Sequence, residues 1–258
     1  MTPKLEDWIA AGDQVNWSIA CPNIVRAMID TGFHEWGFVV YRCVYGDDEA
    51  WRQYMEYFEE DVIEGLKDTG GDILLPQYAK WTVMEDRETL DGASIDAVRE
   101  IFVAWRDEHK FDLEVPLEKR LTPMLKDPPP RLPRFNYCLY VDQKCLDTVA
   151  AFAKQFPPQS SWMPRGPPLV AGLIDADFDE SLYVAGGLRE MPGEHGQHLA
   201  MDGRTCEYVG WSYVDVSFLG GLYDTFHHRR LDDAMDYKRP PRIAPMGDET
   251  MPNDGILA

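Results

Sequence analysis

The 258-residue chain carries 45 acidic and 25 basic side chains, which gives a formal net charge of −20 at pH 7. A charge of this sign repels phosphate groups, so we expect neither a nucleic-acid partner nor binding to a membrane surface. The hydrophobic fraction of 45% is typical of a globular protein with a sizeable core. A small molecule or another protein is therefore the expected partner.

The N-terminal residues MTPKLEDWIAAGDQ include acidic side chains and lack the apolar run of a secretory signal. No stretch of the sequence approaches the roughly 20 apolar residues that a membrane-spanning helix needs. The five cysteines are scattered and form no C-x-x-C pair, so neither a disulfide framework nor a thiolate zinc site is predicted. These features favour a reducing, cytoplasmic setting.

In chain order, the first predicted elements are a helix, a buried strand and a second helix. The first helix covers Asn23 to Thr31. The strand Trp36 to Tyr45 is apolar or aromatic at nearly every position, as expected when both faces of a sheet are covered. Gly46 and two aspartates break this strand, and apolar residues at helical spacing follow from Trp51 to Leu66.

A weaker strand is predicted within Tyr78 to Val83, and a helix runs from Ser94 to about His109. The segment 116–133 is rich in proline and locally basic, which predicts an extended connector. We expect it to join two halves, 36–115 and 134–228, of a single domain that spans residues 1–240.

The second half begins with a predicted strand, Phe135 to Val141, which Asp142 separates from a helical stripe that ends near Phe156. Further strands are predicted at Leu169 to Ile174, at the sheet edge from Ser181 to Ala185, and at Tyr208 to Phe218. A short helix then ends near His228. The tail 241–258 contains too many proline, glycine and polar residues for a core segment, so we expect extended or mobile chain.

This order of elements predicts an α+β protein with the split βαβ pattern of ferredoxin-like folds. The second half repeats the opening strand and helix, so a duplicated form with a helical insertion is compatible with the pattern. We expect a mixed or antiparallel sheet with helices mainly on one face, and a doubly wound α/β sheet is the alternative. No G-x-G-x-x-G motif follows the first strand, so no nucleotide cofactor is expected.

Two clusters of side chains are candidate ligands for a divalent metal. Asp175 and Asp177 follow a buried strand, where carboxylates at alternate positions point to one side and suit Mg²⁺ or Mn²⁺. His195 and His198 lie in a glycine-rich loop and could add a ligand or an acid–base group. Together they predict a divalent-metal-dependent hydrolase or transferase. A self-capping acidic turn and a surface loop are the simpler interpretations.

A second candidate site centres on Arg42, which stands within an otherwise apolar strand, where an unpaired guanidinium would be costly. We expect Asp215 of the last strand to pair with Arg42, either as a structural bridge or in the wall of a pocket. Tyr137 and Tyr213 add aromatic surface from other strands. These four residues predict a binding or interaction protein that uses an aromatic-lined sheet face. A homodimer is compatible with either function.

The run WGFVVYRCVYGDDEAW at Trp36 to Trp51 is similar to a segment found in a broad group of uncharacterised proteins from filamentous fungi. The resemblance extends to the strand at Phe135 to Val141. It implies a fungal source and the same strand, acidic turn and helix. It implies no activity, cofactor or catalytic residue.

Overall fold

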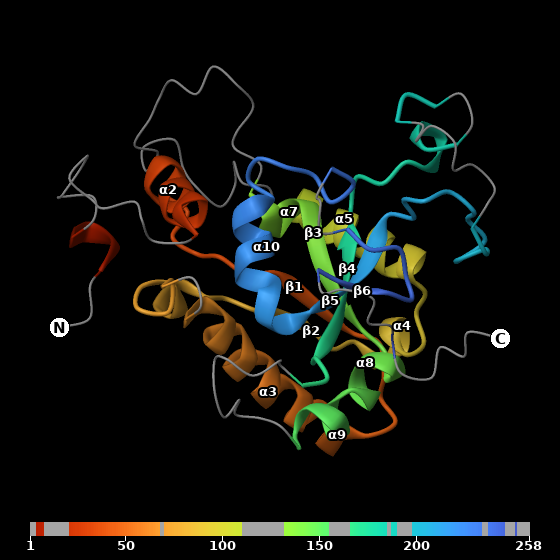
Figure 1. Cartoon of the computed structure of the whole chain (residues 1–258), viewed down its shortest axis with the longest axis horizontal. Coiled ribbons are helices and arrows are strands. Elements are labelled where there is room, and N and C mark those ends of the chain that lie inside the picture. Colours follow the sequence, from red (N-terminus) through yellow and green to blue (C-terminus); the bar gives the residue numbers. More distant parts are fainter. Residues whose placement is uncertain are drawn as a thin grey trace.

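The computed structural model describes residues 4–7, 21–67, 70–109, 132–154, 166–184, 187–189, 198–233, 237–245 and 251. One mixed sheet of six strands runs through this part of the chain in the order β2-β1-β3-β4-β5-β6 (Figure 1). The strands are β1 (Val39–Arg42), β2 (Thr82–Met84), β3 (Tyr137–Val141), β4 (Val170–Asp175), β5 (Trp211–Asp215) and β6 (Ile243–Ala244). The protein therefore has an α+β structure, as predicted.

The strand directions divide the sheet into a parallel portion and a mixed portion. β1 pairs in parallel with both β2 and β3. β4 is antiparallel to β3 and to β5, and β6 is parallel to β5. Because β1 pairs directly with β3, strands from both predicted halves belong to the same sheet.

The helices agree closely with the helical periodicity in the sequence. The longer ones are α2 (Pro22–Thr31), α3 (Asp48–Lys67) and α5 (Ile95–Glu108), and the shorter ones are α4 (Arg87–Leu90), α7 (Pro133–Asn136), α8 (Gln143–Asp147), α9 (Val149–Phe152) and α10 (Leu219–Thr225). Ser94 caps α5 by accepting a hydrogen bond from the Ala97 amide, and Asp142 caps α8 by accepting one from the Cys145 amide. The single helix predicted after Asp142 is divided into α8 and α9.

Helices cover both faces of the sheet instead of mainly one. Tyr41 of β1 meets Phe102 of α5 edge-on, with 6.4 Å between ring centroids. Phe38 has the opposite parity in this strand and lies 5.0 Å from Tyr223 of α10. Figure 1 accordingly shows α10 in front of the sheet and α5 behind it. The nearly uninterrupted apolar character of β1 follows, because each of its faces packs against a helix.

The ferredoxin-like form of the predicted split βαβ pattern is not confirmed. Strand β1 lies between β2 and β3 and is parallel to both, with Val40 opposite Val83 and Leu139, whereas the middle strand of a ferredoxin-like unit is antiparallel to its neighbours. Helix α3 connects β1 to β2, and α5, on the other face, connects β2 to β3. Helices therefore connect the parallel strands across both faces of this portion of the sheet. Hydrophobic periodicity reports which residues are buried but not which strands are neighbours.

Two local predictions also require correction. In place of the edge strand predicted from Ser181 to Ala185, the described residues form the 3₁₀ helix η4 (Glu180–Leu182), in which the Ser181 amide donates a hydrogen bond to the Asp179 carboxylate. The tail was expected to lie outside the core, but Ile243 and Ala244 form β6 and are buried against β5. Most of the connector 116–133 lies outside the described residues.

Close helix packing on the α3 face depends on a glycine. Gly65 of α3 lies against the 3₁₀ helix η5 (Val216–Phe218), which follows β5 directly. A Cβ atom at this position would lie 1.8 Å from the Ser217 carbonyl oxygen. Only glycine permits this approach of α3 to the end of β5.

Candidate functional site

Arg42 has partners other than the one predicted from the sequence. Its guanidinium bonds to Asp48 and lies 3.5 Å from Glu85, while its Nε donates to the Val44 carbonyl at 2.9 Å. The guanidinium also lies 4.5 Å from the centre of the Tyr45 ring. Asp215 is in β5, which β3 and β4 separate from β1, so the predicted pair of Arg42 with Asp215 is wrong.

The other predicted ligand-binding residues do not converge with Arg42. Asp215 accepts hydrogen bonds from the amide and the hydroxyl of Ser217 in η5. The Tyr213 ring packs edge-on against Trp211 at 4.9 Å. Tyr137 stacks on Phe226 at 4.4 Å and accepts a hydrogen bond from the Leu231 amide. These side chains have local structural contacts, so the aromatic sheet face is core.

The predicted metal ligands that the structure describes have partners other than a metal ion. Asp175 is buried and accepts a hydrogen bond from Tyr208 at 2.7 Å, whereas Asp177 forms an ion pair with Arg106 at 2.8 Å. His198 Nε2 lies 2.9 Å from a Glu207 carboxylate oxygen. His195 is outside the described residues. Within the described ranges, no group of three or more His, Cys, Asp or Glu side chains could hold a metal ion.

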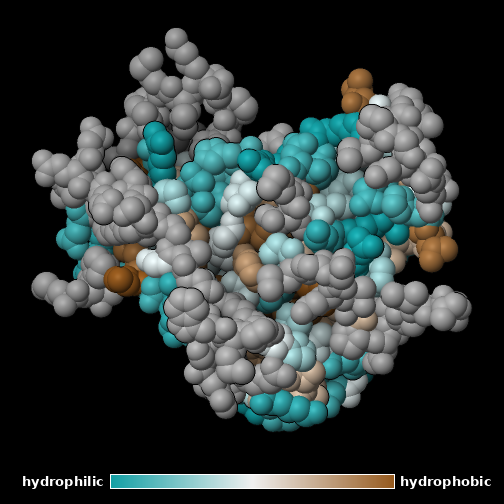
Figure 2. Space-filling view, in the orientation of Figure 1, coloured by the Kyte–Doolittle hydropathy of each residue, from teal (hydrophilic) through white to brown (hydrophobic). Residues whose placement is uncertain are grey.

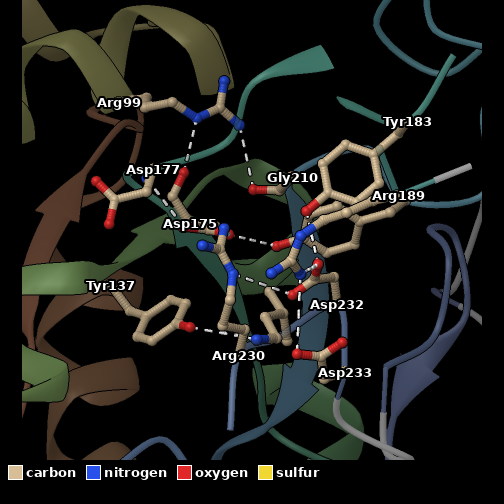
Figure 3. Close-up of polar contacts among 12 residues, drawn as sticks. Arg99, Tyr137, Asp175, Asp177, Tyr183, Arg189, Gly210, Arg230, Asp232 and Asp233 are labelled. Carbon is tan, nitrogen blue, oxygen red and sulfur yellow. Dashed lines mark hydrogen bonds and ion pairs between the residues drawn. The ribbon is translucent and has the colours of Figure 1, made fainter. Parts of the chain in front are cut away.

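Asp175 instead belongs to a buried network at the end of β4, which we call the Asp175 network (Figure 3). Arg230 lies between two carboxylates, with 3.7 Å to Asp175 and 3.3 Å to Asp232. Asp232 also accepts a hydrogen bond from Tyr183 at 2.6 Å and pairs with Arg189. The network thus ties Tyr183, Arg189 and the segment 230–232 to the sheet, as Figure 3 shows.

The electrostatics of the Asp175 network are balanced. Burial raises the pKa of the Asp175 carboxyl, although hydrogen bonds from Tyr208 and the Asp177 amide oppose that shift. Burial would also raise the pKa of Asp232, but hydrogen bonds from Tyr183 and Arg189 outweigh it and lower that pKa. Two carboxylates face two guanidinium groups, and each has a partner inside the protein. This arrangement stabilises the end of the sheet, because the four charges pair with one another.

The edge of the sheet at β2 differs from the Asp175 network, because backbone hydrogen-bonding groups at this edge face away from the sheet. Among the described strands, β2 pairs only with β1. Lys80 and Thr82 donate their amides to Trp36 and Phe38, so the amides of the alternate residues Trp81 and Val83 point away from β1. The Val83 side chain is 37% exposed. This edge can therefore accept a further strand.

A small apolar pocket adjoins the same edge. It has a volume of about 160 Å³. Residues of α3, of the 3₁₀ helix η2 (Leu75–Tyr78) and of the chain entering β1 and β2 line it: Trp36, Glu59, Val62, Ile63, Leu66, Pro76, Ala79 and Trp81. Pockets for drug-sized ligands have roughly 300–1,000 Å³. This pocket has room for one side chain. We call it and the outward side of residues 81–83 the β2-edge groove.

The surface near the β2-edge groove is acidic. Helix α3 has the sequence DEAWRQYMEYFEEDVIEGLK, with seven acidic and two basic residues and hence a formal net charge of −5. Arg52 pairs with Glu49 and Glu56, and Lys67 pairs with Glu64. In the described part of the chain, Glu59 and Glu60 have no such cation. On the face drawn in Figure 2, the hydrophobic colour of the described residues appears only in small separate areas.

Sequence reasoning missed both the Asp175 network and the β2-edge groove. Arg230 and Asp232 follow a predicted short helix and have no distinctive spacing from Asp175, so only the fold brings them together. The groove had a weak signal, since Pro76 before a short strand is typical of an edge position.

No protein-family model, curated protein or solved structure matches this chain significantly. None of the helices in the described ranges has the length and apolar character needed to cross a membrane.

Proposed function

We propose that this protein is an interaction protein that binds an extended polypeptide segment by strand addition at β2. The observation that carries this proposal is the outward-facing backbone of Trp81 and Val83 next to an apolar pocket. An added strand takes its affinity from main-chain hydrogen bonds and its specificity from pockets for alternate side chains. The β2-edge groove offers both features.

The edge alone would be insufficient, because many sheets have a short edge strand that serves to discourage pairing. The adjoining pocket distinguishes this edge, and its partly exposed Ile63, at 40%, leaves an apolar surface for a bound side chain to cover. A volume of about 160 Å³ favours a side chain over a small-molecule ligand. The proposal thus retains the predicted binding function and moves it from the sheet face to the sheet edge.

The alternative of a divalent-metal-dependent hydrolase or transferase has less support. Arg230 and Tyr208 occupy the surroundings of the Asp175 carboxylate, and Arg106 pairs with Asp177. A metal at Asp175 would have to displace the buried Arg230 cation or remain close to it, which is electrostatically unfavourable. No described geometry favours this reaction class.

The test is a selection of random dodecapeptides displayed on phage against the full chain, followed by affinity measurements on the enriched peptides. The informative variant is Val83→Pro, which removes an outward N–H and leaves the β1 ladder intact, because proline is tolerated where an edge N–H faces solvent. We expect enriched peptides to bind the wild-type protein with micromolar affinity. We expect Val83→Pro to lower the affinity of these peptides at least about tenfold. This corresponds to roughly 1.4 kcal/mol for the loss of one backbone hydrogen bond and the weakening of the adjacent one.

The matched control is Val83→Ala, which keeps the amide and shortens the side chain, and it should weaken binding much less than the proline variant. Thermal unfolding and circular dichroism establish that both variants remain folded. Equal binding to the wild-type protein and a folded Val83→Pro variant would refute strand addition at β2, as would a selection that enriches no peptide.

A further inference from the structure

We infer that the segment bound at the β2-edge groove is basic, with lysine or arginine alternating with an apolar residue. This inference rests on the proposed strand addition and specifies the chemistry of its partner. Its basis is the charge of α3 beside the groove.

The unpaired carboxylates of α3 are placed next to the pocket. Glu59 lines the pocket itself. Glu59 and Glu60 precede Ile63 by four and three residues, so on the helix surface both are direct neighbours of this exposed apolar side chain. In the described structure, the cations of α3 pair with other acids, Arg52 with Glu49 and Glu56 and Lys67 with Glu64. Two negative charges therefore adjoin the apolar surface with no cation opposite them.

The sheet geometry directs alternate residues of an added strand toward α3. Trp81 and Val83 share a parity in β2, and Trp81 projects to the α3 face, where its ring lies 4.9 Å from that of Phe58. Neighbouring strands lie about 4.8 Å apart and their directly opposite side chains share a face. Every second side chain of the bound segment would therefore extend toward the pocket and its carboxylates. The long stem of lysine or arginine can cover Ile63 while its charge reaches Glu59 or Glu60.

A second copy of this chain is a poor occupant. Pairing two β2 edges would bring together two copies of α3, each with a formal charge of −5, from chains that each carry −20. Such juxtaposed like charges are unfavourable. A basic segment, in contrast, is attracted by the negative charge of α3 and therefore associates faster.

The experiment compares three acetylated nonapeptides in which valine alternates with lysine, with serine or with glutamate. Fluorescence polarisation measures their affinity for the full chain at about 50 mM and about 300 mM NaCl, which changes the screening of exposed charges. We expect the lysine peptide to bind about tenfold more tightly than the serine peptide at low salt, and the glutamate peptide to bind most weakly. The advantage of the lysine peptide should shrink at high salt.

The variant Glu59→Gln/Glu60→Gln locates the effect. It should weaken the lysine peptide about fivefold and leave the serine peptide within about twofold, as expected for two exposed ion pairs. The matched control is Glu100→Gln/Asp107→Gln, which removes the same charge from α5 on the other face of the sheet. It should change neither affinity by more than about twofold.

Three results would overturn the inference, and they are distinguishable from failure of the proposed function. If the lysine and serine peptides bind with equal affinity and Val83→Pro weakens the binding of both, strand addition at β2 is supported but the inference of a basic partner is wrong. If the α5 control weakens the lysine peptide as much as the α3 variant, only the net charge acts and Glu59 and Glu60 have no local part. If light scattering shows a dimer that Val83→Pro dissociates, a second copy fills the groove and the inference is wrong.

Discussion

The substitution Gly65→Ala gives the sharpest test of the described fold. In an isolated helix this change would stabilise by about 1 kcal/mol, because alanine is the better helix former. Here the added methyl group would lie 1.8 Å from the Ser217 carbonyl oxygen and 2.7 Å from its carbonyl carbon. Real Cβ atoms essentially never approach closer than 3.0 Å, so α3 and η5 must separate by more than an ångström. The oxygen belongs to the backbone and cannot rotate away.

That separation loosens the packing of α3 against the sheet, where Phe58, Val62 and Leu66 are buried. Overpacking of a core typically costs about 1–3 kcal/mol and sometimes more. We expect a net loss of about 3 kcal/mol in the free energy of unfolding, which is a decrease in Tm of roughly 10 °C for a chain of this size. Urea denaturation and thermal unfolding measure both quantities.

The matched control is Gly221→Ala in α10, where no atom lies within 4 Å of the position of the new methyl group. It should stabilise the protein by about 0.5–1 kcal/mol through helix propensity. A Gly65→Ala variant as stable as the wild type would show that α3 does not approach η5 as described, and the reasoning would fail.

Three further predictions concern buried polar groups. Asp232→Asn removes the charged partner of Arg189 and Arg230, and urea titration should show a loss of about 2 kcal/mol in the free energy of unfolding, a value between those of exposed and buried ion pairs. The control Asp233→Asn, at a side chain that is 62% exposed, should lose far less. Tyr54→Phe deletes the hydrogen bond to the Val170 carbonyl at 2.9 Å and should cost about 1 kcal/mol, and an unchanged urea midpoint would contradict that contact. Burial lowers the pKa of His227 from 6.5 to about 4, so the unfolded state binds more protons than the folded state between these pH values. The free energy of unfolding, measured relative to that of His227→Gln, should therefore fall by up to about 3 kcal/mol as the pH decreases from 6.5 to 4. Parallel pH profiles for the two proteins would refute the burial of this imidazole.

Elements with a long period or a clear cap could be predicted from the sequence. The helix after Asp48 buries Trp51, Tyr54 and Phe58 as its periodicity indicates, and Ser94 caps α5 where expected. The apolar runs at β1, β3 and β4 were also identified as strands, although the structure makes β1 shorter than the run from Trp36. Local hydrogen bonding and burial periodicity determine these features, so a single sequence is sufficient.

Strand neighbours and long-range pairs could not be predicted in the same way. The presence of Arg42 in an apolar strand correctly indicated that it needs a carboxylate, but Asp48 and Glu85 follow β1 and its neighbour β2, whereas Asp215 ends β5, which β3 and β4 separate from β1. Likewise, the burial of Asp175 beside Arg230 depends on how the segment after α10 returns to the sheet. Such pairs depend on topology, which hydrophobic periodicity does not encode.

The place of β6 at the far edge of the sheet has a consequence for synthesis of the chain. The edge formed by β2 is complete once residue 84 has been made, whereas the outer edge of β5 is covered by residues 243–244, which follow β5 only after η5, α10 and residues 226–242. During translation, β5 must therefore remain unpaired on that side until residues 243–244 have left the ribosome. Unpaired strand edges of incomplete chains are prone to aggregation, so this interval is when the nascent protein has the greatest need of a chaperone.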